Sequence, residues 1–429
     1  MRIAIIGAGW AGLAAAVQAV SDGHQVALFE ASRTPGGRAR AVPGVLPDGT
    51  ELVLDNGQHI LIGAYTETLR LMRQVGINPQ QALLRLPLTL LYPDGSGLKL
   101  PRWPAPLDAL YGILRARGWQ MQDKLSLLRA AQAWRRSGFT CAVTTTVAQL
   151  CEPLTQRIRQ EMIEPLCVSA LNTASVDASA QVFLRVLRDA LFGEKGGSNL
   201  LLPRIDLTQL FPQAALDWLT LVRDSEIHLG ERIDLIEQRA AQWRVQGRAF
   251  DRVVLAVSST DAARILDNSA QTAIESAASK MRQWAAAARA LRFEAITTVY
   301  AWAPGAALSV PMLSLHSTAA APAQFAFDRG QLGGPSGLLA FVVSASHGER
   351  KELQTQVLNQ AQTQLGLTLQ AVQTLVEKRA TFACTPGLHR PPMHVAPGLL
   401  ACGDYTAGPY PATLEGAVRS GVAAAGAMP

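Results

Sequence analysis

"RIAIIGAGWAGLAAAVQAVSDGHQVALFE", residues 2–30, is the stretch that decides the fold. An apolar run typical of a buried strand leads into Gly7-x-Gly9-x-x-Gly12, an Ala-rich helical pattern follows, and a second strand pattern ends at Glu30. Strand, glycine-rich turn, helix and strand in this order predict a βαβ unit. In such a unit the first glycine makes the tight turn, the second lets the backbone approach a pyrophosphate, and the third lets the helix pack closely.

The acidic residue at the end of the second strand pattern narrows the choice of nucleotide. A carboxylate at Glu30 accepts hydrogen bonds from ribose hydroxyls and repels a 2′-phosphate, while the helix N-terminus stabilises the phosphates. The motif therefore predicts FAD or NAD rather than NADP. A signal peptide or membrane anchor is the competing interpretation, but glycines interrupt the apolar run and charged residues begin at Asp22. The predicted nucleotide-binding residues of this stretch are Gly7, Ala8, Gly9, Trp10, Ala11, Gly12, Glu30 and Ala31.

Composition limits the remaining function classes. With 429 residues, of which 48% are hydrophobic and 17% charged, the chain predicts a globular protein of two domains. Its net charge of +6 comes mostly from scattered arginines, and aromatic residues make up only 6%, which does not favour nucleic-acid binding. The charge is either a solvated surface or an attraction to anionic lipid head groups. Five cysteines without a C-x-x-C pair predict neither a disulfide framework nor a metal site, and fit a cytoplasmic protein, with peripheral contact to the inner membrane as the alternative.

The order of patterns along the chain predicts two domains threaded through each other. Strand, loop and helix patterns at both ends and in the middle frame a mostly helical stretch at about 103–192. We also expect one helix over 205–222 and a pair of strands over 226–237. The fold class predicted is α/β, with a Rossmann-like nucleotide-binding domain interleaved with an α+β substrate-binding domain. The nucleotide-binding segments are 1–80, 200–260 and 385–429, and the substrate-binding segments are 81–199 and 261–384.

One helical pattern within 103–192 has two interpretations. Leu107, Leu110, Tyr111 and Leu114 follow one another at the spacing of a single helix face. Such a stripe is usually packed in a core, and that is the interpretation we favour. Because Trp103, Trp119, Arg115 and Arg117 surround it, a helix lying at a membrane interface is the alternative.

"DNGQHILIG", residues 55–63, also has two interpretations. Asn56-Gly57 between two apolar runs is typical of a type I′ hairpin turn, because both residues tolerate a positive φ. Alternatively, Gly57, Gln58 and His59 form the wall of a cofactor pocket, where glycine permits close approach. The short stretch taken alone favours the turn.

"PGGRAR", residues 35–40, is the point at which the chain resembles the flavoprotein superfamily of amine oxidases and carotenoid desaturases. The resemblance implies that Gly36, Gly37 and Arg38 lie along the pyrophosphate of FAD. It also covers "DNG" at 55–57 and "CGDYTAGPYPATLEGAVRSG" at 402–421. It implies FAD-binding roles for Asn56, Gly57, Gln58, His59, Ile233 at the adenine, Gly403, Asp404 at the ribityl chain, and Thr413, Leu414, Glu415, Gly416 and Ala417 beside the flavin.

Two features indicate which branch of the superfamily the chain resembles. Amine oxidases carry an aromatic residue where this chain has Thr413, and no cysteine stands where the flavin is attached covalently, so an amine substrate is disfavoured. "LDNGQHILIGAYTETLRLM" at 54–72 and "YPATLEGAVRSG" at 410–421 are similar to the squalene-associated branch, the hydroxysqualene dehydroxylases. The resemblance implies a C30 isoprenoid substrate whose hydroxyl is replaced by hydrogen using reduced FAD. A carotenoid-type desaturase and a non-catalytic prenyl-lipid binder are the alternatives.

The expected chemistry needs a proton donor and a hydride. We expect an acid to protonate the allylic hydroxyl, water to leave, and the reduced flavin to give a hydride to the cation, inside an apolar pocket. His59 is the first candidate for the acid, because imidazole titrates near neutral pH. Gln58, Tyr405 and Tyr410 are weaker candidates, and His389 and His394 are interpreted as loop residues rather than metal ligands. The reductant of the flavin and the oligomeric state are left open.

Overall fold

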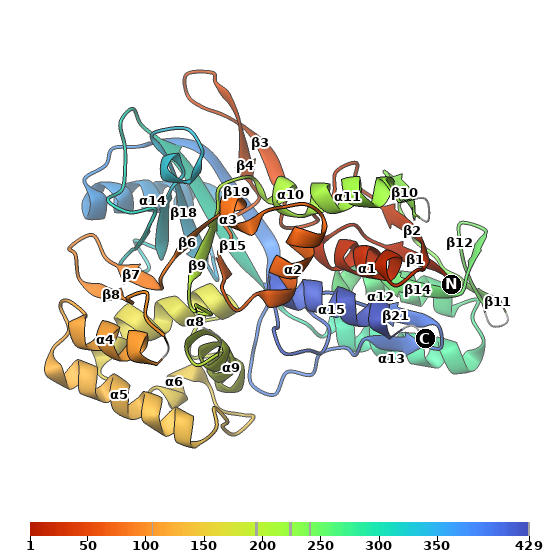
Figure 1. Ribbon diagram of the computed structural model, residues 1–429, viewed down its shortest axis with the longest axis horizontal. Helices are drawn as coiled ribbons and strands as arrows, with labels where there is room; N and C mark the ends of the chain where they lie inside the picture. Colours follow the sequence, from red (N-terminus) through yellow and green to blue (C-terminus); the bar gives the residue numbers. More distant parts are fainter. Residues whose placement is uncertain (105, 194–195, 223–224, 240–241, 428–429) are drawn as a thin grey trace.

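The computed structural model describes residues 1–104, 106–193, 196–222, 225–239 and 242–427, and its α/β fold contains two main sheets (Figure 1). The first is six-stranded, in the order β10-β2-β1-β14-β21-β20, and only the β20–β21 pair is antiparallel. The predicted βαβ unit is confirmed at its centre. The strands are β1 (Arg2–Ile6), β2 (Gln25–Glu30), β10 (Ser225–Leu229), β14 (Arg252–Leu255), β20 (His394–Ala396) and β21 (Leu399–Ala401).

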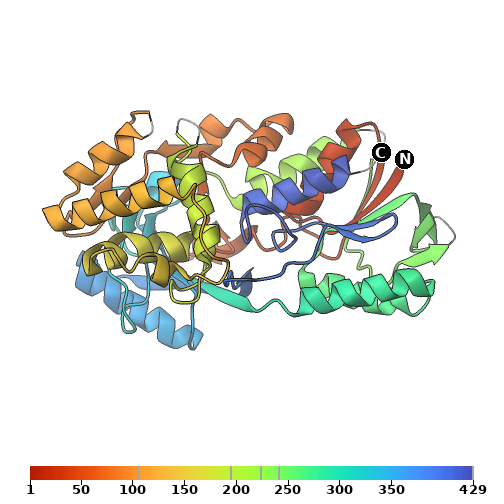
Figure 2. The same ribbon diagram turned by 90° about the horizontal axis from the view of Figure 1, so that it is seen from below.

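Helices cover both faces of this sheet because its strands are apolar on both sides. Ile3 and Ile5 of β1 pack among α1 (Trp10–Ser21), α11 (Pro212–Thr220) and α15 (Leu414–Gly426). Ile6, on the opposite face, joins the cluster formed with α12 (Ser259–Ala270) and α13 (Glu275–Arg289). Figure 2 shows the two helix layers above and below the sheet. This alternation is expected of a parallel sheet buried on both faces.

The second main sheet is antiparallel and has five strands in the order β16-β17-β18-β15-β19. One of its faces packs on α14 (Arg350–Leu365), through Val299, Phe341 and Val343 among others. The other face looks toward the first sheet and the helical region. The strands are β15 (Phe293–Trp302), β16 (Met312–Ser314), β17 (Phe325–Asp328), β18 (Leu338–Ser344) and β19 (Gln370–Phe382).

Shorter elements join these two units. Four small ladders are formed by β3 (Ala41–Val45) with β4 (Glu51–Asp55); by β5 (Leu61–Ile62), β9 (Leu200–Pro203) and β6 (Leu83–Leu86); by β7 (Thr89–Leu91) with β8 (Gly97–Lys99); and by β11 (Glu237–Arg239), β12 (Gln242–Val245) and β13 (Arg248–Phe250). The short helices are α2 (Thr66–Gln74), α3 (Pro79–Ala82), α10 (Leu207–Leu210) and the 3₁₀ turn Gly330–Leu332.

The stretch 103–192 is helical, as predicted, but its apolar stripe is not a core. Leu107, Leu110, Tyr111 and Leu114 of α4 (Leu107–Arg115) are all exposed, whereas Gly112 and Ile113 are buried. The core interpretation of this stripe is therefore wrong. The other helices here are α5 (Met121–Arg136), α6 (Val147–Leu150), α7 (Gln156–Ile158), a π-helical turn at Arg159–Ile163, α8 (Glu164–Leu171) and α9 (Ala180–Leu191).

Two further expectations need correction. The helix expected over 205–222 is two helices, because Pro212 begins α11 at the first helical position and Phe211 separates it from α10. The strand pair expected over 226–237 is one strand, β10, followed by irregular backbone that reaches β11 at Glu237. The domain boundaries stay predictions. Because α12 and α13 share their core with β1, β14 and β21, we propose that the substrate-binding segment resumes after α13 and not at residue 261.

Within the described residues, no helix is long and apolar enough to cross a membrane. The five cysteines are free thiols, and four of them are buried.

Candidate functional site

A cavity of about 470 Å³ runs from the parallel sheet to the antiparallel sheet. It begins at the carboxyl ends of β1, β2, β14 and β21, where Gly7, Glu30, Ser258 and Asp404 lie on its wall. Ligands of open α/β sheets bind at this edge. The cavity ends on one face of β15, β17, β18 and β19.

Glycines form the nucleotide end of the cavity. Gly7 has φ +112, and a Cβ there would lie 2.5 Å from the carbonyl oxygen of Ala256, so no other residue fits this turn. A Cβ at Gly9 would meet no atom within 4 Å and would project into free space. The backbone of Gly9 and the N-terminus of α1 are thus open to the cavity, which suits the phosphates of a dinucleotide. Gly36 and Gly37 line the same wall, and Gly36 forms a bridge to Gly9.

Glu30 stands where a ribose-binding carboxylate is expected. It lines the cavity, and its two oxygens accept backbone N–H groups from Ala8 at 2.7 Å and Ser32 at 2.8 Å. These bonds fix the carboxylate and leave each oxygen a further lone pair for a ligand. Ala31 and Ile233 line the same region.

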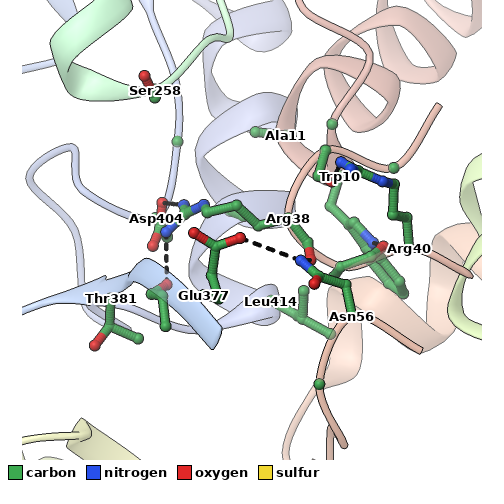
Figure 3. Close-up of a pocket in the computed structure, with 18 of the residues that line it drawn as sticks. Trp10, Ala11, Arg38, Arg40, Asn56, Ser258, Glu377, Thr381, Asp404 and Leu414 are labelled. Carbon is green, nitrogen blue, oxygen red and sulfur yellow. Dashed lines mark hydrogen bonds and ion pairs between the residues drawn. The ribbon is translucent and has the colours of Figure 1, made fainter. Parts of the chain in front are cut away.

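Arg38 joins three distant segments at the middle of the cavity (Figure 3). Its guanidinium donates to Asp404 Oδ1 at 2.6 Å and to the carbonyl oxygens of Ala380 at 2.6 Å and Arg379 at 3.1 Å. The carboxylate of Asp404 raises the pKa of Arg38 above its ordinary value. Asn56 makes a second contact with β19, because its side-chain amide donates to Glu377 Oε2 at 3.1 Å. One arginine thus ties the Gly36–Arg38 turn to the C-terminal loop and to β19.

The stretch 56–60 is a cavity wall and not a hairpin turn. Strand β4 pairs with β3, and β5 pairs with β9, so Asn56-Gly57 joins strands that are not partners of each other. The hairpin interpretation is therefore wrong. Gly57 has φ +116, and Asn56, Gly57, Gln58 and His59 all line the cavity.

His59 is held by its own segment. Its Nδ1 lies 3.0 Å from the carbonyl oxygen of Gly57, which fits an Nδ1–H donor. Burial lowers the pKa of His59 below its ordinary value of 6.5, and the Gly57 carbonyl opposes this only in part. The imidazole is therefore mostly neutral at neutral pH.

Two buried polar atoms on the cavity wall have no protein partner within the described part of the chain. They are Gln58 Nε2 and Thr298 Oγ1. Gln58 Oε1 accepts from Arg329 Nη1 at 3.3 Å, which leaves the Nε2 donors free. Buried polar atoms almost always have partners, so these two indicate a polar group of a ligand at this place.

Arg329 also faces Asp55, and both side chains are almost fully buried. The distance from Nη2 to Oδ2 is 3.9 Å, and Asp55 Oδ1 accepts the N–H of Leu207 at 2.8 Å. Burial raises the pKa of Asp55 from 3.8 to about 6, although the Leu207 amide and Arg329 lower it. The carboxyl group of Asp55 therefore binds its proton more tightly in the folded protein than in the unfolded chain.

We expect Asp55 to make stability fall as the pH rises from about 4 to about 6. Below this window the carboxyl is protonated in both states, and above it the folded state carries a penalty of about 3 kcal/mol for the buried charge. Asp55→Asn keeps the oxygen that accepts the N–H of Leu207, and it should flatten the dependence of unfolding free energy on pH between about 4 and about 6. Urea unfolding at several pH values measures this. A slope of wild-type size in the variant would contradict the assignment to Asp55.

The far end of the cavity is a largely apolar sheet face. Ile296, Phe325, Phe327 and Val342 line it, on β15, β17 and β18. Positions two apart on each strand share a face, so Thr298 and Ser344 stand among them, and Leu375 and Glu377 follow on β19. Such a surface suits a hydrocarbon chain with few polar groups.

Four predicted binding residues do not line the cavity. Ala8 lies behind the wall, and Gly12 is the point where α1 packs on β1, as its motif position implied. Glu415 is fully buried and accepts the N–H groups of Glu67 and Thr68, so it caps α2 and is not part of the cavity lining. Gly416 donates to Thr413 Oγ1 as part of the N-cap of α15. The remaining predicted binding residues, with Thr413, Leu414 and Ala417, do line the cavity.

The weaker acid candidates have structural partners. Tyr405 lines the cavity, but its hydroxyl donates to the Val257 carbonyl at 3.2 Å, and burial raises its pKa well above 10. Tyr410 lies outside the lining and donates to Asp189 on α9 at 2.9 Å. His389 is an exposed loop residue, whereas His394 begins the edge strand β20 and is not in a loop.

Sequence reasoning missed several lining residues. Ala256, Val257 and Ser258 follow β14, and their place at the carboxyl end of a parallel strand is a signal that could have found them. No comparable signal existed for Thr298, Glu377 or the other residues of the antiparallel sheet, because only the fold brings them to the nucleotide-binding unit.

Comparison with known proteins identifies relatives along the whole chain. A family model described as "Flavin containing amine oxidoreductase" matches residues 10–429. Hydroxysqualene dehydroxylase of Zymomonas mobilis is 26% identical over 98% of this chain and 97% of that protein. Zeta-carotene desaturase of Zea mays is 29% identical over 36% of this chain and 25% of that protein. The crystal structure of an oxidoreductase from Methanosarcina mazei has a TM-score of 0.71 at 16% identity, with 99% of both chains covered, so the fold is shared.

Proposed function

The chain belongs to the flavin-containing amine oxidoreductase family, and from that premise we propose that it removes the hydroxyl of hydroxysqualene reductively to give squalene. Its cofactor is FAD, and it is a flavin oxidoreductase. The open backbone at Gly9, the fixed carboxylate of Glu30 and the unpartnered Gln58 Nε2 fit that cofactor and a polar group beside it. Gly36, Gly37 and Arg38 would hold the phosphates, Ile233 the adenine, and the 56–59 wall would border the flavin ring.

The sheet face at the end of the cavity is the main observation in favour of an isoprenoid substrate. Ile296, Phe325, Phe327 and Val342 offer a hydrocarbon surface, and Thr298 is the unpartnered polar group among them. A long isoprenoid with a single hydroxyl has the matching chemistry. The carboxylate that follows on β19, Glu377, already accepts a hydrogen bond from Asn56 at 3.1 Å, which makes it a poorer partner for an amine cation. The end-to-end similarity to hydroxysqualene dehydroxylase supports the same choice.

The reaction breaks a C–O bond and forms a C–H bond. The hydroxyl takes a proton and leaves as water, which creates an allylic cation. When bound, reduced FAD would supply the hydride to this cation and would itself become oxidised, so an external reductant would have to reduce it again. Gln58 would donate a hydrogen bond from Nε2 to the hydroxyl oxygen, since Arg329 fixes the other end of its amide. The apolar sheet face would exclude water from the cation.

We propose His59 as the proton donor. With Nδ1 directed to Gly57, the Nε2 atom is the side of the ring that can serve the cavity. Because burial lowers the pKa of His59, only a small fraction is imidazolium at pH 7, and turnover should rise as the pH falls toward 6.

The test is an anaerobic assay of the holoenzyme with dithionite and hydroxysqualene, in which squalene is measured by mass spectrometry. We expect squalene from the wild type, a turnover about 10- to 100-fold lower in Gln58→Leu through the lost hydrogen bond, and a flat pH profile in His59→Gln. Asp55→Asn is the matched control, because it removes a nearby carboxyl whose pKa is raised to about 6 and should leave the His59 profile intact.

The outcomes separate the candidate functions. Full turnover in His59→Gln would remove the acid role and leave the reaction standing. A yellow protein that forms no squalene but dehydrogenates a polyene precursor would be a desaturase. That alternative is favoured by the local similarity to zeta-carotene desaturase.

A further inference from the structure

The end of the molecule farthest from the chain termini carries an exposed apolar surface. Trp103, Leu107, Leu110, Tyr111 and Leu114 are 40–57% exposed. The rings of Trp103 and Tyr111 contact each other, with centroids 4.6 Å apart. We call these five residues the α4 surface. Figures 1 and 2 both place α4 and α5 at one end of the long axis, with the N- and C-termini at the other end.

The opposite side of α4 fixes this surface in place. Ile113 is buried in the core of the substrate-binding unit. A Cβ at Gly112 would lie 2.4 Å from Leu100 Cδ2, so the helix rests directly on the strand end after β8. Lys124 of α5 donates to the carbonyl oxygen of Leu114 and caps the helix. The apolar side chains therefore face outward because their helix is packed from behind.

The exposed charges of the segment that carries the α4 surface have one sign. Between residues 101 and 136, among the described residues, every charged side chain that is not buried is basic: Arg102, Arg115, Arg117, Lys124, Arg129, Arg135 and Arg136. The two acidic residues of this stretch, Asp108 and Asp123, are buried and accept hydrogen bonds from the backbone N–H groups of Ala109 and Gln120. An apolar helix face with tryptophan and tyrosine, whose own segment exposes cations and no carboxylate, has the composition of a surface that lies on anionic lipid.

We propose that the α4 surface docks onto an anionic lipid bilayer, with the leucines and aromatic rings in the head-group region and the arginines on lipid phosphates. Two observations favour lipid over a second copy of the chain. Among the described residues of 101–136, no exposed carboxylate could pair with the cations of the same segment in a symmetric contact. Its largest side chains are also those enriched at membrane interfaces. This docking is independent of the reaction proposed above.

The test is flotation of the holoenzyme with vesicles of phosphatidylcholine alone or of equal parts phosphatidylcholine and phosphatidylglycerol. We expect binding to the anionic vesicles that weakens as salt is raised. Leu110→Ser/Leu114→Ser and Arg115→Gln/Arg117→Gln should each lower the fraction bound about tenfold. Leu221→Ser/Ile274→Ser is the matched control, because it removes two exposed aliphatic side chains elsewhere and should bind like the wild type. Flavin absorbance checks that every variant is folded.

Several results would overturn the proposal. They are the absence of binding to anionic vesicles, equal binding to neutral vesicles, and wild-type binding by either α4 variant. A concentration-dependent dimer in size-exclusion chromatography that Leu110→Ser/Leu114→Ser abolishes would show that a second copy covers the surface instead.

Discussion

Gly12→Ala should destabilise the protein by about 3 kcal/mol and abolish retention of FAD, whereas Gly9→Ala should fold normally and lose only cofactor affinity. The added Cβ at Gly12 would lie 1.8 Å from the carbonyl oxygen of Gly7 and 3.0 Å from Ala256 Cβ, so α1 would have to move off β1. This strain exceeds the roughly 1 kcal/mol that alanine contributes to helix propensity. The apolar packing beneath α1 would open at the same time.

The same one-carbon change at Gly9 meets no protein atom within 4 Å. The backbone there has φ −75 and ψ 179, which any residue adopts. Its Cβ would occupy the space that the pyrophosphate needs, and FAD affinity should fall about 100-fold, equivalent to roughly 3 kcal/mol of lost contacts. Thermal unfolding and FAD titration of the apoprotein measure the two effects. Wild-type FAD affinity in Gly9→Ala would contradict the place given to the phosphates, and a wild-type unfolding temperature in Gly12→Ala would contradict the packing argument.

Local patterns were predictable from sequence because each depends on neighbouring residues. The βαβ unit follows from glycine spacing and strand periodicity, and the structure has β1, α1 and β2 at those positions. The helical stretch around Leu107–Leu114 was also predictable. Its orientation was not, because a periodic pattern shows that one face is apolar and does not show what that face meets.

What sequence patterns could not predict has a common cause in contacts between distant residues. Asn56-Gly57 has the local chemistry of a hairpin turn, but β4 already has a partner in β3. Glu415 follows a motif implied to face the flavin, yet its oxygens bind backbone amides of α2 that lie almost a whole chain length away. Gln58 was chosen correctly as a cavity residue, but nothing in its own segment indicates that Arg329 holds its amide.

Replacing Arg38 with methionine should have the second large effect, because Arg38 joins three segments at the cofactor. The change removes the hydrogen bonds to Asp404, Ala380 and Arg379 and leaves the Asp404 carboxylate, 8% exposed, without its cation. Unfolding free energy should fall by about 2 kcal/mol, less than for a fully buried pair because the Arg38 side chain is 38% exposed. FAD affinity should fall at least about 100-fold, because an unpaired carboxylate would then face the proposed FAD site.

Two further variants distinguish a charge effect from a loss of contacts. Arg38→Lys keeps the cation but cannot reach Asp404 and both carbonyl oxygens at once, so its FAD affinity should lie between those of the wild type and Arg38→Met. Arg38→Met/Asp404→Asn removes the unpaired charge and should be more stable than Arg38→Met alone. Suppose instead that the loss of unfolding free energy in the double variant equals the sum of the losses in Arg38→Met and in Asp404→Asn. In that case the two side chains are not coupled, and the stability of this turn depends on the carbonyl contacts to β19.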